Sequence, residues 1–372
     1  MVTTISRVSI CFVLTLAVVP TAAFTREPLQ PTVDGPEADN LVGKVTGYLI
    51  TDQDPGIVAF SLPSLEKRVV LQLARDDEDD QPTIHAMSGP DSQARIAYIE
   101  DHYFVANEAD QRHMLKTVQA DGTQDTEIFS RPGDAMWATT TAGKGEIGSH
   151  LALAPTGGWV AFLSEISNRQ MPRALLNVGR IEIWNVAEKT GAKTRIEAID
   201  EPMSWFPDGK RLTYTKLVPR NELPQQAAGL DHFGNYFDQT WDEVPAIFVF
   251  NTQTKTTSFL YVGWKPIVSH DGNTVYVGGW GKQDYRWRSV DVQTSESQPI
   301  TWPGFQGGLI AAPSDRLALY RGLPTTGARG QDTRNYMLTI KIAEHETNTF
   351  QTIVPFIDVR RDVSFGLRAL NK

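Results

Sequence analysis

The amino-acid sequence predicts an all-β protein, a six-bladed β-propeller built of four-stranded antiparallel blades. Short runs rich in Val, Ile, Tyr, Phe and Thr alternate with Gly, Asp, Asn and Pro turns after Lys44, and no long segment has the 3.6-residue period of a helix. One type of hairpin recurs five times, and a second hairpin follows each of the five. Two hairpins per repeat make one four-stranded blade, the unit of a propeller.

The recurring hairpin is an apolar stretch, a turn such as Pro207-Asp208-Gly209, and a second apolar stretch. Asp and Gly tolerate the positive φ of a tight turn, and Pro presets its first corner. The five instances begin at His85, Leu151, Met203, Ile267 and Leu309.

The second hairpins are clearest after Met114, Arg180 and Ala246. Their turns are Asp121-Gly122, Lys189-Thr190-Gly191 and Gln253-Thr254-Lys255. These segments supply the two outer strands of each blade.

The first and last segments of the pattern are complementary. Val45 to Leu73 supplies three strands and lacks an inner one, whereas Arg361 to Gly366 has the pattern of an inner strand. A ring in which the C-terminal strand completes the first blade leaves no open sheet edge. This closure gives six blades.

The composition is that of a globular protein, with 41% hydrophobic and 21% charged residues among 372. The formal net charge is −9, which disfavours nucleic acid as a partner because phosphate binding needs clustered Lys and Arg. The only cysteine, Cys11, lies in the N-terminal segment. A mature chain without it has no disulfide, thiolate metal site or cysteine nucleophile.

The N-terminal segment has the three parts of a secretory signal peptide. A basic residue, Arg7, precedes an apolar stretch from Val8 to Val19, and Ala22-Ala23 ends a small-residue cleavage site. We expect residues 1–23 to be the signal peptide, 24–43 an extended leader and 44–372 a single propeller domain. This organisation predicts a periplasmic or secreted monomer without a membrane span after cleavage.

The turns also carry a family resemblance. Phe206 to Leu212, Ser269 to Gly272 and Ala120 to Gly122 resemble the repeats of TolB-type propellers. In those families a six-bladed propeller serves as a periplasmic binding module or as the non-catalytic half of a serine peptidase. The resemblance implies the same fold for nearly the whole chain after Lys44.

No catalytic signature is present: the sequence has no Gly-x-Ser-x-Gly elbow, no His-Glu-x-x-His and no dinucleotide fingerprint. We therefore expect no cofactor and no metal site, and interpret Asp76 to Asp80 as a solvated loop, with calcium binding as the alternative. His85 and His150 begin inner strands and are interpreted as structural, with ligand or metal contact as the alternative. Trp159, Trp184 and Trp287 are expected to pack between blades.

Long connections between the second and third strands of several blades point to one binding face. They are Glu165 to Gly179, Lys216 to Pro245 and Gly322 to Asn335. Loops of this length are often functional, and binding surfaces are enriched in Tyr and Trp. The alternative is that these aromatic residues fold back onto the propeller. The candidate ligand-binding residues are His150, His232, Tyr236, Trp241, Trp280 and Tyr285.

The sequence favours a binding protein over an enzyme. The predicted function is an exported binding or scaffold propeller that engages a protein, peptide or glycan through these loops. The alternative is a propeller hydrolase or lyase with a channel-facing site, assisted by a divalent metal if one is held there.

Overall fold

The fold consists of short antiparallel sheets that follow one another along the chain. Residues 32–372 form one compact unit. A computed structural model describes residues 41–53, 56–74, 80–104, 112–132, 147–171, 174–224, 227, 242–278, 287–300, 309–312, 317–322, 337–344, 349–358 and 363–369. The predicted signal peptide and most of the predicted leader lie outside these ranges.

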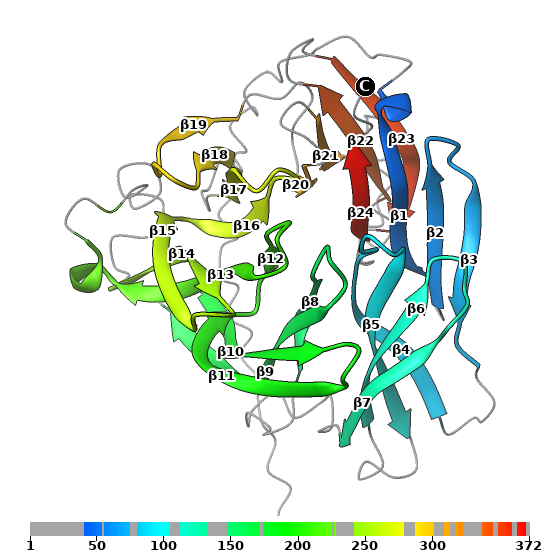
Figure 1. Cartoon of the computed structure of the whole chain (residues 1–372), viewed down its shortest axis with the longest axis horizontal. Coiled ribbons are helices and arrows are strands. Elements are labelled where there is room, and N and C mark those ends of the chain that lie inside the picture. The colour runs from blue at the N-terminus through cyan, green and yellow to red at the C-terminus, as the bar shows by residue number, and fades with distance from the viewer. Residues whose placement is uncertain are drawn as a thin grey trace, which may run out of the picture. The chain divides into compact units, whose positions relative to one another are not determined.

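Within these ranges the strands form six four-stranded sheets, which we number I to VI (Figure 1). Their spatial orders are β24-β1-β2-β3, β4-β5-β6-β7, β8-β9-β10-β11, β12-β13-β14-β15, β16-β17-β18-β19 and β20-β21-β22-β23. Every pairing between neighbouring strands is antiparallel. The predicted four-stranded antiparallel blade is therefore confirmed.

Sheets I to III contain the first half of the pattern. Sheet I is made of β1 (Val45–Gln53), β2 (Gly56–Leu62), β3 (Lys67–Gln72) and β24 (Val363–Ala369), and a short 3-10 helix, η1 (Val42–Lys44), precedes it. Sheet II is made of β4 (Asp80–Ser88), β5 (Arg95–Phe104), β6 (Arg112–Gln119) and β7 (Thr126–Pro132). Sheet III is made of β8 (Ile147–Leu153), β9 (Trp159–Met171), β10 (Ala174–Asn185) and β11 (Thr190–Ile199).

Sheets IV to VI repeat the pattern. Sheet IV is made of β12 (Ser204–Trp205), β13 (Arg211–Pro219), β14 (Glu243–Asn251) and β15 (Thr256–Val262), with η3 (Arg220–Glu222) after β13. Sheet V is made of β16 (Trp264–Val268), β17 (Thr274–Gly278), β18 (Trp287–Asp291) and β19 (Ser297–Pro299). Sheet VI is made of β20 (Leu309–Ala311), β21 (Leu317–Gly322), β22 (Met337–Glu344) and β23 (Thr349–Asp358).

One edge strand of each sheet contacts the corresponding strand of the next sheet. These contacts run from β24 to β4, β8, β12, β16 and β20, and from β20 back to β24. We call these six the inner strands. Sheets that succeed one another through their inner strands are the arrangement of a β-propeller.

The predicted pairing of the C-terminal strand with the first three strands is present. β24 lies antiparallel to β1, from Val45 opposite Ala369 to Thr51 opposite Val363 (Figure 1). The strand begins at Val363 and ends at Ala369, slightly later than the range predicted from the sequence.

The turns between the first two strands of a sheet are built as their residues predict. In sheet IV, Gly209 has a φ of 65°, and the Oδ1 atom of Asp208 accepts hydrogen bonds from the backbone amides of Lys210 and Arg211. The turns of neighbouring sheets also touch, because the amide of Ser92 donates to the carbonyl of Pro155. We call the end of the sheets that carries these turns the turn face, and the opposite end the connection face.

The core lies between the sheets, where large side chains from one sheet pack on the next. The rings of Trp184 on β10 and Phe129 on β7 have centroids 4.4 Å apart. Trp159 packs with a buried cluster that includes residues of sheet IV, and buried Trp287 of sheet V packs with residues of sheet VI. The expectation that these three tryptophans pack between blades is confirmed.

One predicted loop was wrong. The segment from Glu165 to Gly179 is not a connection, because β9 and β10 continue as a long hairpin to Met171 and Ala174. A bulge between Val178 and Arg180 lets the pairing continue, and Glu165 beside it has a φ of 57°. Met171, Leu176 and Val178 of this hairpin are buried with residues of sheet IV.

The other two connections are shorter than predicted or lie outside the described residues. β13 ends at Pro219 and β14 begins at Glu243, so the connection in sheet IV spans residues 220–242 rather than 216–245. Residues 323–336 of sheet VI lie outside the described ranges. Neither of the described helices has the length and hydropathy needed to cross a bilayer.

Candidate binding site on the inner strands

A carboxylate that binds two imidazoles lies in sheet II. The Oδ1 atom of Asp101 is 2.6 Å from Nδ1 of His113, and its Oδ2 atom is 2.9 Å from Nδ1 of His85. The three residues come from β5, β6 and β4 in that order. Asp101 and His113 are opposite each other in the strand register, whereas His85 occupies a bulge between Ile84 and Ala86.

The bulge explains how His85 reaches Asp101. A bulge adds one residue to a strand and changes the direction of a side chain, so a residue at this place can leave the regular alternation. The inner strand β8 is irregular in the same way between Ile147 and Leu151, and His150 lies in that interval. Both histidines were predicted to begin inner strands, but His85 lies well inside β4, which begins at Asp80.

Burial and charge act in opposite directions on this group. Burial alone lowers the pKa of His85, but the hydrogen bond to Asp101 and the negative charges of Asp101 and Asp200 outweigh it and raise the pKa to about 9. Burial alone raises the pKa of Asp101, but the hydrogen bonds from His113 and His85 hold it well below its usual range. At neutral pH, a protonated His85 therefore faces an ionised Asp101.

Unlike the Nδ1 atoms, which bind Asp101, the Nε2 atoms of the two rings are not satisfied by any residue that the structure describes. Nε2 of His85 and Nε2 of His113 are both buried and have no hydrogen-bond partner among the described residues. The backbone of Gly148 lies close enough to favour the protonated ring of His85, but it makes no hydrogen bond to Nε2. A buried polar atom without a partner costs about 1–3 kcal/mol, so these two nitrogens are the least satisfied polar atoms of the group.

A second group lies next to the first, across the boundary between sheets II and III. Asp200, just after β11, accepts hydrogen bonds at Oδ2 from the backbone amide of Ser149 at 3.0 Å and from its hydroxyl at 2.8 Å. Its Oδ1 atom is 3.3 Å from Nδ1 of His150. Burial raises the pKa of Asp200, but these bonds and the charge of His150 lower it below its ordinary value overall. Gly148 is required here, because a Cβ at this position would lie 2.5 Å from Oδ1 of Asp200.

Ser149, His150 and Asp200 do not form a proton relay. In a catalytic triad, the imidazole binds the carboxylate through one nitrogen and the serine through the other. Here, the hydroxyl of Ser149 and the carboxylate of Asp200 both approach Nδ1 of His150, and the hydroxyl donates directly to the carboxylate. The arrangement orients the imidazole without activating the serine.

The other side of β5 carries a separate ionic network. Glu100 binds Nε2 of His102 at 2.7 Å and Nζ of Lys116 at 2.9 Å. Lys116 also pairs with Asp125 at 3.2 Å, and Asp125 accepts a 2.6 Å bond from the hydroxyl of Tyr98. Successive strand residues face opposite sides, so this network lies away from Asp101.

The site on the inner strands lies toward the connection face. Asp101 is near the end of β5, Ser149 and His150 are near the start of β8, and Asp200 lies in the connection that enters β12. Of the ligand-binding candidates from the sequence, the structure places His150 here. His232, Tyr236, Trp241, Trp280 and Tyr285 lie outside the described residues.

Sequence reasoning missed Asp101, His113 and Asp200 as members of this site. The usable signal was the acidic pair Glu100-Asp101 directly after the apolar stretch Arg95 to Ile99, which places two carboxylates on opposite sides of one strand end. Within the described part of the chain, no group of three or more His, Cys, Asp or Glu side chains is arranged to hold a metal ion.

No protein-family model and no curated protein matches the chain. Among solved structures, it is similar to TolB from Acinetobacter baumannii, with 13% identity over 87% of this chain and 67% of that chain and a TM-score of 0.48. It is similar to a putative TolB from Agrobacterium tumefaciens, with 14% identity over 88% and 99% of the two chains and a TM-score of 0.46. An oligogalacturonate lyase in complex with manganese shares 14% identity over 80% and 74%, with a TM-score of 0.46. At these values the likenesses assign no function, and the fold class rests on the sheets themselves.

Proposed function

We propose that the chain is an exported binding propeller that engages a protein, peptide or glycan through its connection face. The observation that carries the proposal is the imidazole–carboxylate site of His85, Asp101, His113, His150 and Asp200 at the connection-face side of the inner strands. In this proposal the six sheets are six blades of one ring, which β24 closes in the first blade. Residues 1–23 direct the chain to the periplasm or the cell exterior.

The location of the site supports recognition at this face. Binding residues concentrate on loops that a rigid scaffold positions, and the connection of residues 220–242 leaves and re-enters sheet IV at the connection face. That connection contains the aromatic candidates Tyr236 and Trp241. A ligand that spans the connections and the inner strands would use both sets of residues.

His150 is the member of the site that a ligand would meet first. Its side chain is 32% exposed, against 1% for Asp101; the ring of His85 is 28% exposed, but its Nε2 atom is buried. Its described hydrogen bonds all involve Nδ1, so Nε2 is directed away from Ser149 and Asp200. An oriented imidazole with one exposed nitrogen is suited to a hydrogen bond with a hydroxyl or amide of the ligand.

A hydrolase or lyase is the second candidate. It is favoured by the two imidazoles that Asp101 orients through Nδ1, because a carboxylate-oriented imidazole is a common general acid or base, and the protonated ring of His85 can serve as the acid. In this alternative, the unpartnered Nε2 atoms of His85 and His113 would exchange protons with a substrate.

The test is capture of a partner from an envelope extract by immobilised residues 24–372. His150→Gln and the double variant Tyr236→Ala/Trp241→Ala are compared with Gln253→Ala, an exposed position on the turn face. We expect the first two to lose the same captured partner at an unchanged melting temperature, while Gln253→Ala retains it. Equal capture by all variants would contradict recognition at the connection face.

The enzyme alternative and the location have tests of their own. His113→Gln would abolish turnover of a captured glycan or peptide if the site were catalytic, whereas a binding protein releases its ligand unchanged.

Mass spectrometry of extracytoplasmic material is expected to find Phe24 as the first residue. An intact Met1 in the cytosol would refute export.

A further inference from the structure

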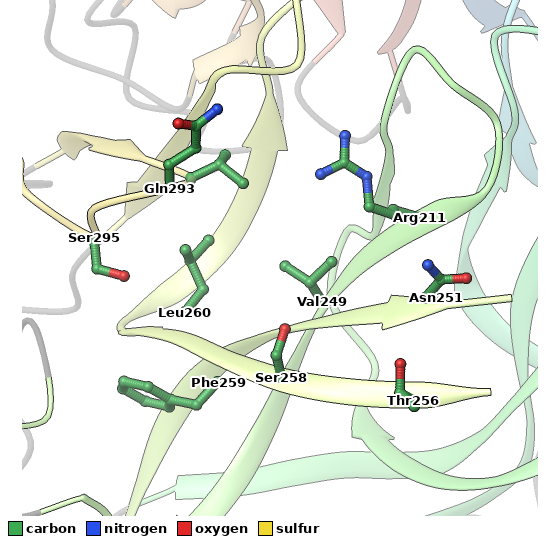
Figure 2. A pocket seen from close by; sticks show the side chains of 10 residues that line it. Arg211, Val249, Asn251, Thr256, Ser258, Phe259, Leu260, Gln293 and Ser295 are labelled. Carbon is green, nitrogen blue, oxygen red and sulfur yellow. The ribbon is translucent and has the colours of Figure 1, made fainter. Parts of the chain in front are cut away.

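A second site lies at the turn face, between sheets IV and V. It is a pocket of about 430 Å³ that opens between the outer strands of sheet IV and the turn before β19. Figure 2 shows Arg211 on one side of the pocket and Gln293 and Ser295 on the other, with Val249 and Leu260 between them. Its volume lies within the range of small-molecule sites, about 300–1,000 Å³.

Arg211 supplies the only formal charge among the residues that line this pocket. Its Nε atom donates to Oδ2 of Asp208 at 2.7 Å, and its guanidinium lies 4.0 Å over the ring of Phe206. These two contacts fix the plane of the guanidinium. Within the described part of the chain, no hydrogen bond involves its terminal Nη atoms.

The equivalent arginine of sheet II differs, because one of its terminal nitrogens has a hydrogen-bond partner. Arg95 also donates through Nε to the aspartate of its turn, Asp91, at 2.9 Å. Its Nη2 atom, however, donates to the carbonyl of Gly157 in the next sheet at 2.6 Å. The same repeat position thus serves a contact between sheets in one place and lines a pocket in the other.

The remaining polar lining consists of groups that can donate hydrogen bonds. Oδ1 of Asn251 is occupied by the amides of Gln253 and Thr254, so this side chain offers its Nδ2 group. Gln293 offers a second amide, and Ser258 and Ser295 offer hydroxyls. Val249, Leu260 and Val292 supply an apolar wall.

We propose that this pocket binds a small ligand that carries a carboxylate, held by the terminal nitrogens of Arg211. A planar guanidinium whose orientation is fixed binds a carboxylate through two parallel hydrogen bonds. The amides and hydroxyls bind the polar body of the ligand, and the apolar wall packs against its carbon skeleton. A peptide C-terminus and an acidic sugar both have this chemistry. The site does not depend on the function proposed for the connection face.

The experiment is a ligand-observed NMR titration of residues 24–372 with four probes. Acetyl-alanyl-alanine and D-glucuronate carry the carboxylate, and acetyl-alanyl-alanine amide and D-glucose are their neutral counterparts. We expect at least one carboxylate to bind with a dissociation constant on the order of 1 mM, and its neutral counterpart at least tenfold more weakly. The probe that binds identifies the source of the carboxylate.

Three variants assign the binding to this pocket. Arg211→Gln is expected to weaken binding at least tenfold, and Gln293→Ala, which keeps the pair of Arg211 and Asp208, severalfold. Lys210→Gln removes a neighbouring exposed charge and is expected to bind as the parent does. The melting temperature of each variant confirms that it is folded. Three results would each overturn the proposal: no carboxylate binding at about 10 mM, neutral probes that bind as tightly as the carboxylates, or folded Gln293→Ala and Arg211→Gln proteins that both bind as tightly as the parent.

Discussion

Asp101 and His113 are cross-strand partners on β5 and β6, and a 2.6 Å hydrogen bond joins their side chains in the interior of the protein. The bond alone would make an ordinary pair, but the bulge in β4 brings His85 to the other oxygen of the same carboxylate. One aspartate therefore holds the three innermost strands of sheet II together. This dependence leads to the first two predictions.

Asp101→Asn is expected to destabilise the protein by about 3 kcal/mol, because it removes the buried carboxylate that pairs with the protonated, partly buried ring of His85. The measurement is urea unfolding at neutral pH. Glu188→Gln, at an exposed turn of sheet III, is the matched carboxylate-to-amide control and is expected to change the free energy of unfolding by less than about 0.5 kcal/mol. Similar values for the two variants would show that Asp101 does not stabilise the fold.

Because of His85, the free energy of unfolding is expected to fall as the pH rises above neutral. Its pKa in the folded protein, about 9, lies above its ordinary value of 6.5, so the fold favours the protonated ring. This stabilisation is complete below about pH 6.5 and is lost as the pH rises through 9, by no more than about 3 kcal/mol. The carboxylate of Asp101 acts in the opposite sense, since its lowered pKa makes stability fall only in strong acid.

The measurement is urea unfolding at about pH 6 and about pH 9.5 for the parent and for His85→Gln. The parent is expected to lose more stability across this interval than the variant, because the variant lacks the titrating ring. An NMR titration of the His85 ring gives its pKa directly. Equal pH dependence in both proteins, or a ring pKa near 6.5, would refute the predicted coupling.

The boundary between sheets II and III contains a second buried ion pair. Arg131 on β7 contacts both oxygens of Glu182 on β10, at 2.7 and 3.3 Å, and lies over the rings of Phe129 and Phe162. Arg131→Met is expected to cost about 3 kcal/mol, because it leaves a carboxylate that is only 5% exposed without its counter-ion. Thermal and urea unfolding measure this change.

A double-mutant cycle separates the charge effect from packing. Glu182→Met and the double variant Arg131→Met/Glu182→Met complete the cycle. The double variant is expected to be more stable than the sum of the single changes predicts, since it buries no unpaired charge. Strict additivity would mean that the two side chains act independently.

Removal of β24 is expected to disrupt sheet I. Deletion of residues 363–372 removes the strand that pairs with β1 along seven residue pairs, from Val45 to Thr51, and leaves the edge of β1 open. We expect insoluble protein or a large fall in melting temperature. Deletion of residues 370–372, which follow β24, is the control and is expected to leave both unchanged. A truncated chain that melts like the parent would show that the pairing contributes little.

The long hairpin of sheet III shows why one predicted loop failed. Residues 165–179 contain Ser, Asn, Arg and Gln without apolar alternation, a composition that normally indicates a loop. This part of the hairpin extends toward sheet IV, where it buries only scattered residues such as Met171 and Val178. Strand prediction relies on apolar residues that alternate along one buried face. It cannot detect a strand pair in which only scattered side chains are buried.

The candidate site was equally hard to derive from the chain alone. His85 and His150 were recognised as residues of inner strands, but their partners Asp101 and Asp200 lie 16 and 50 residues away in the sequence. The bulges that turn the two imidazoles toward these carboxylates have no sequence signature of their own. Their meeting depends on strand register and on the contact between sheets II and III.

The sequence by itself determined the all-β class, the hairpin as the repeated unit and the pairing of the last strand with the first. These properties follow from local chemistry: turns such as Asp208-Gly209 and alternation within single strands act over a few residues. Only the tertiary structure decided which polar groups meet, from His85 on β4 and Asp101 on β5 to Arg211 at the turn face. The physical reason is that a carboxylate or guanidinium is stabilised or left open by neighbours from other strands and sheets, whose approach no local pattern encodes.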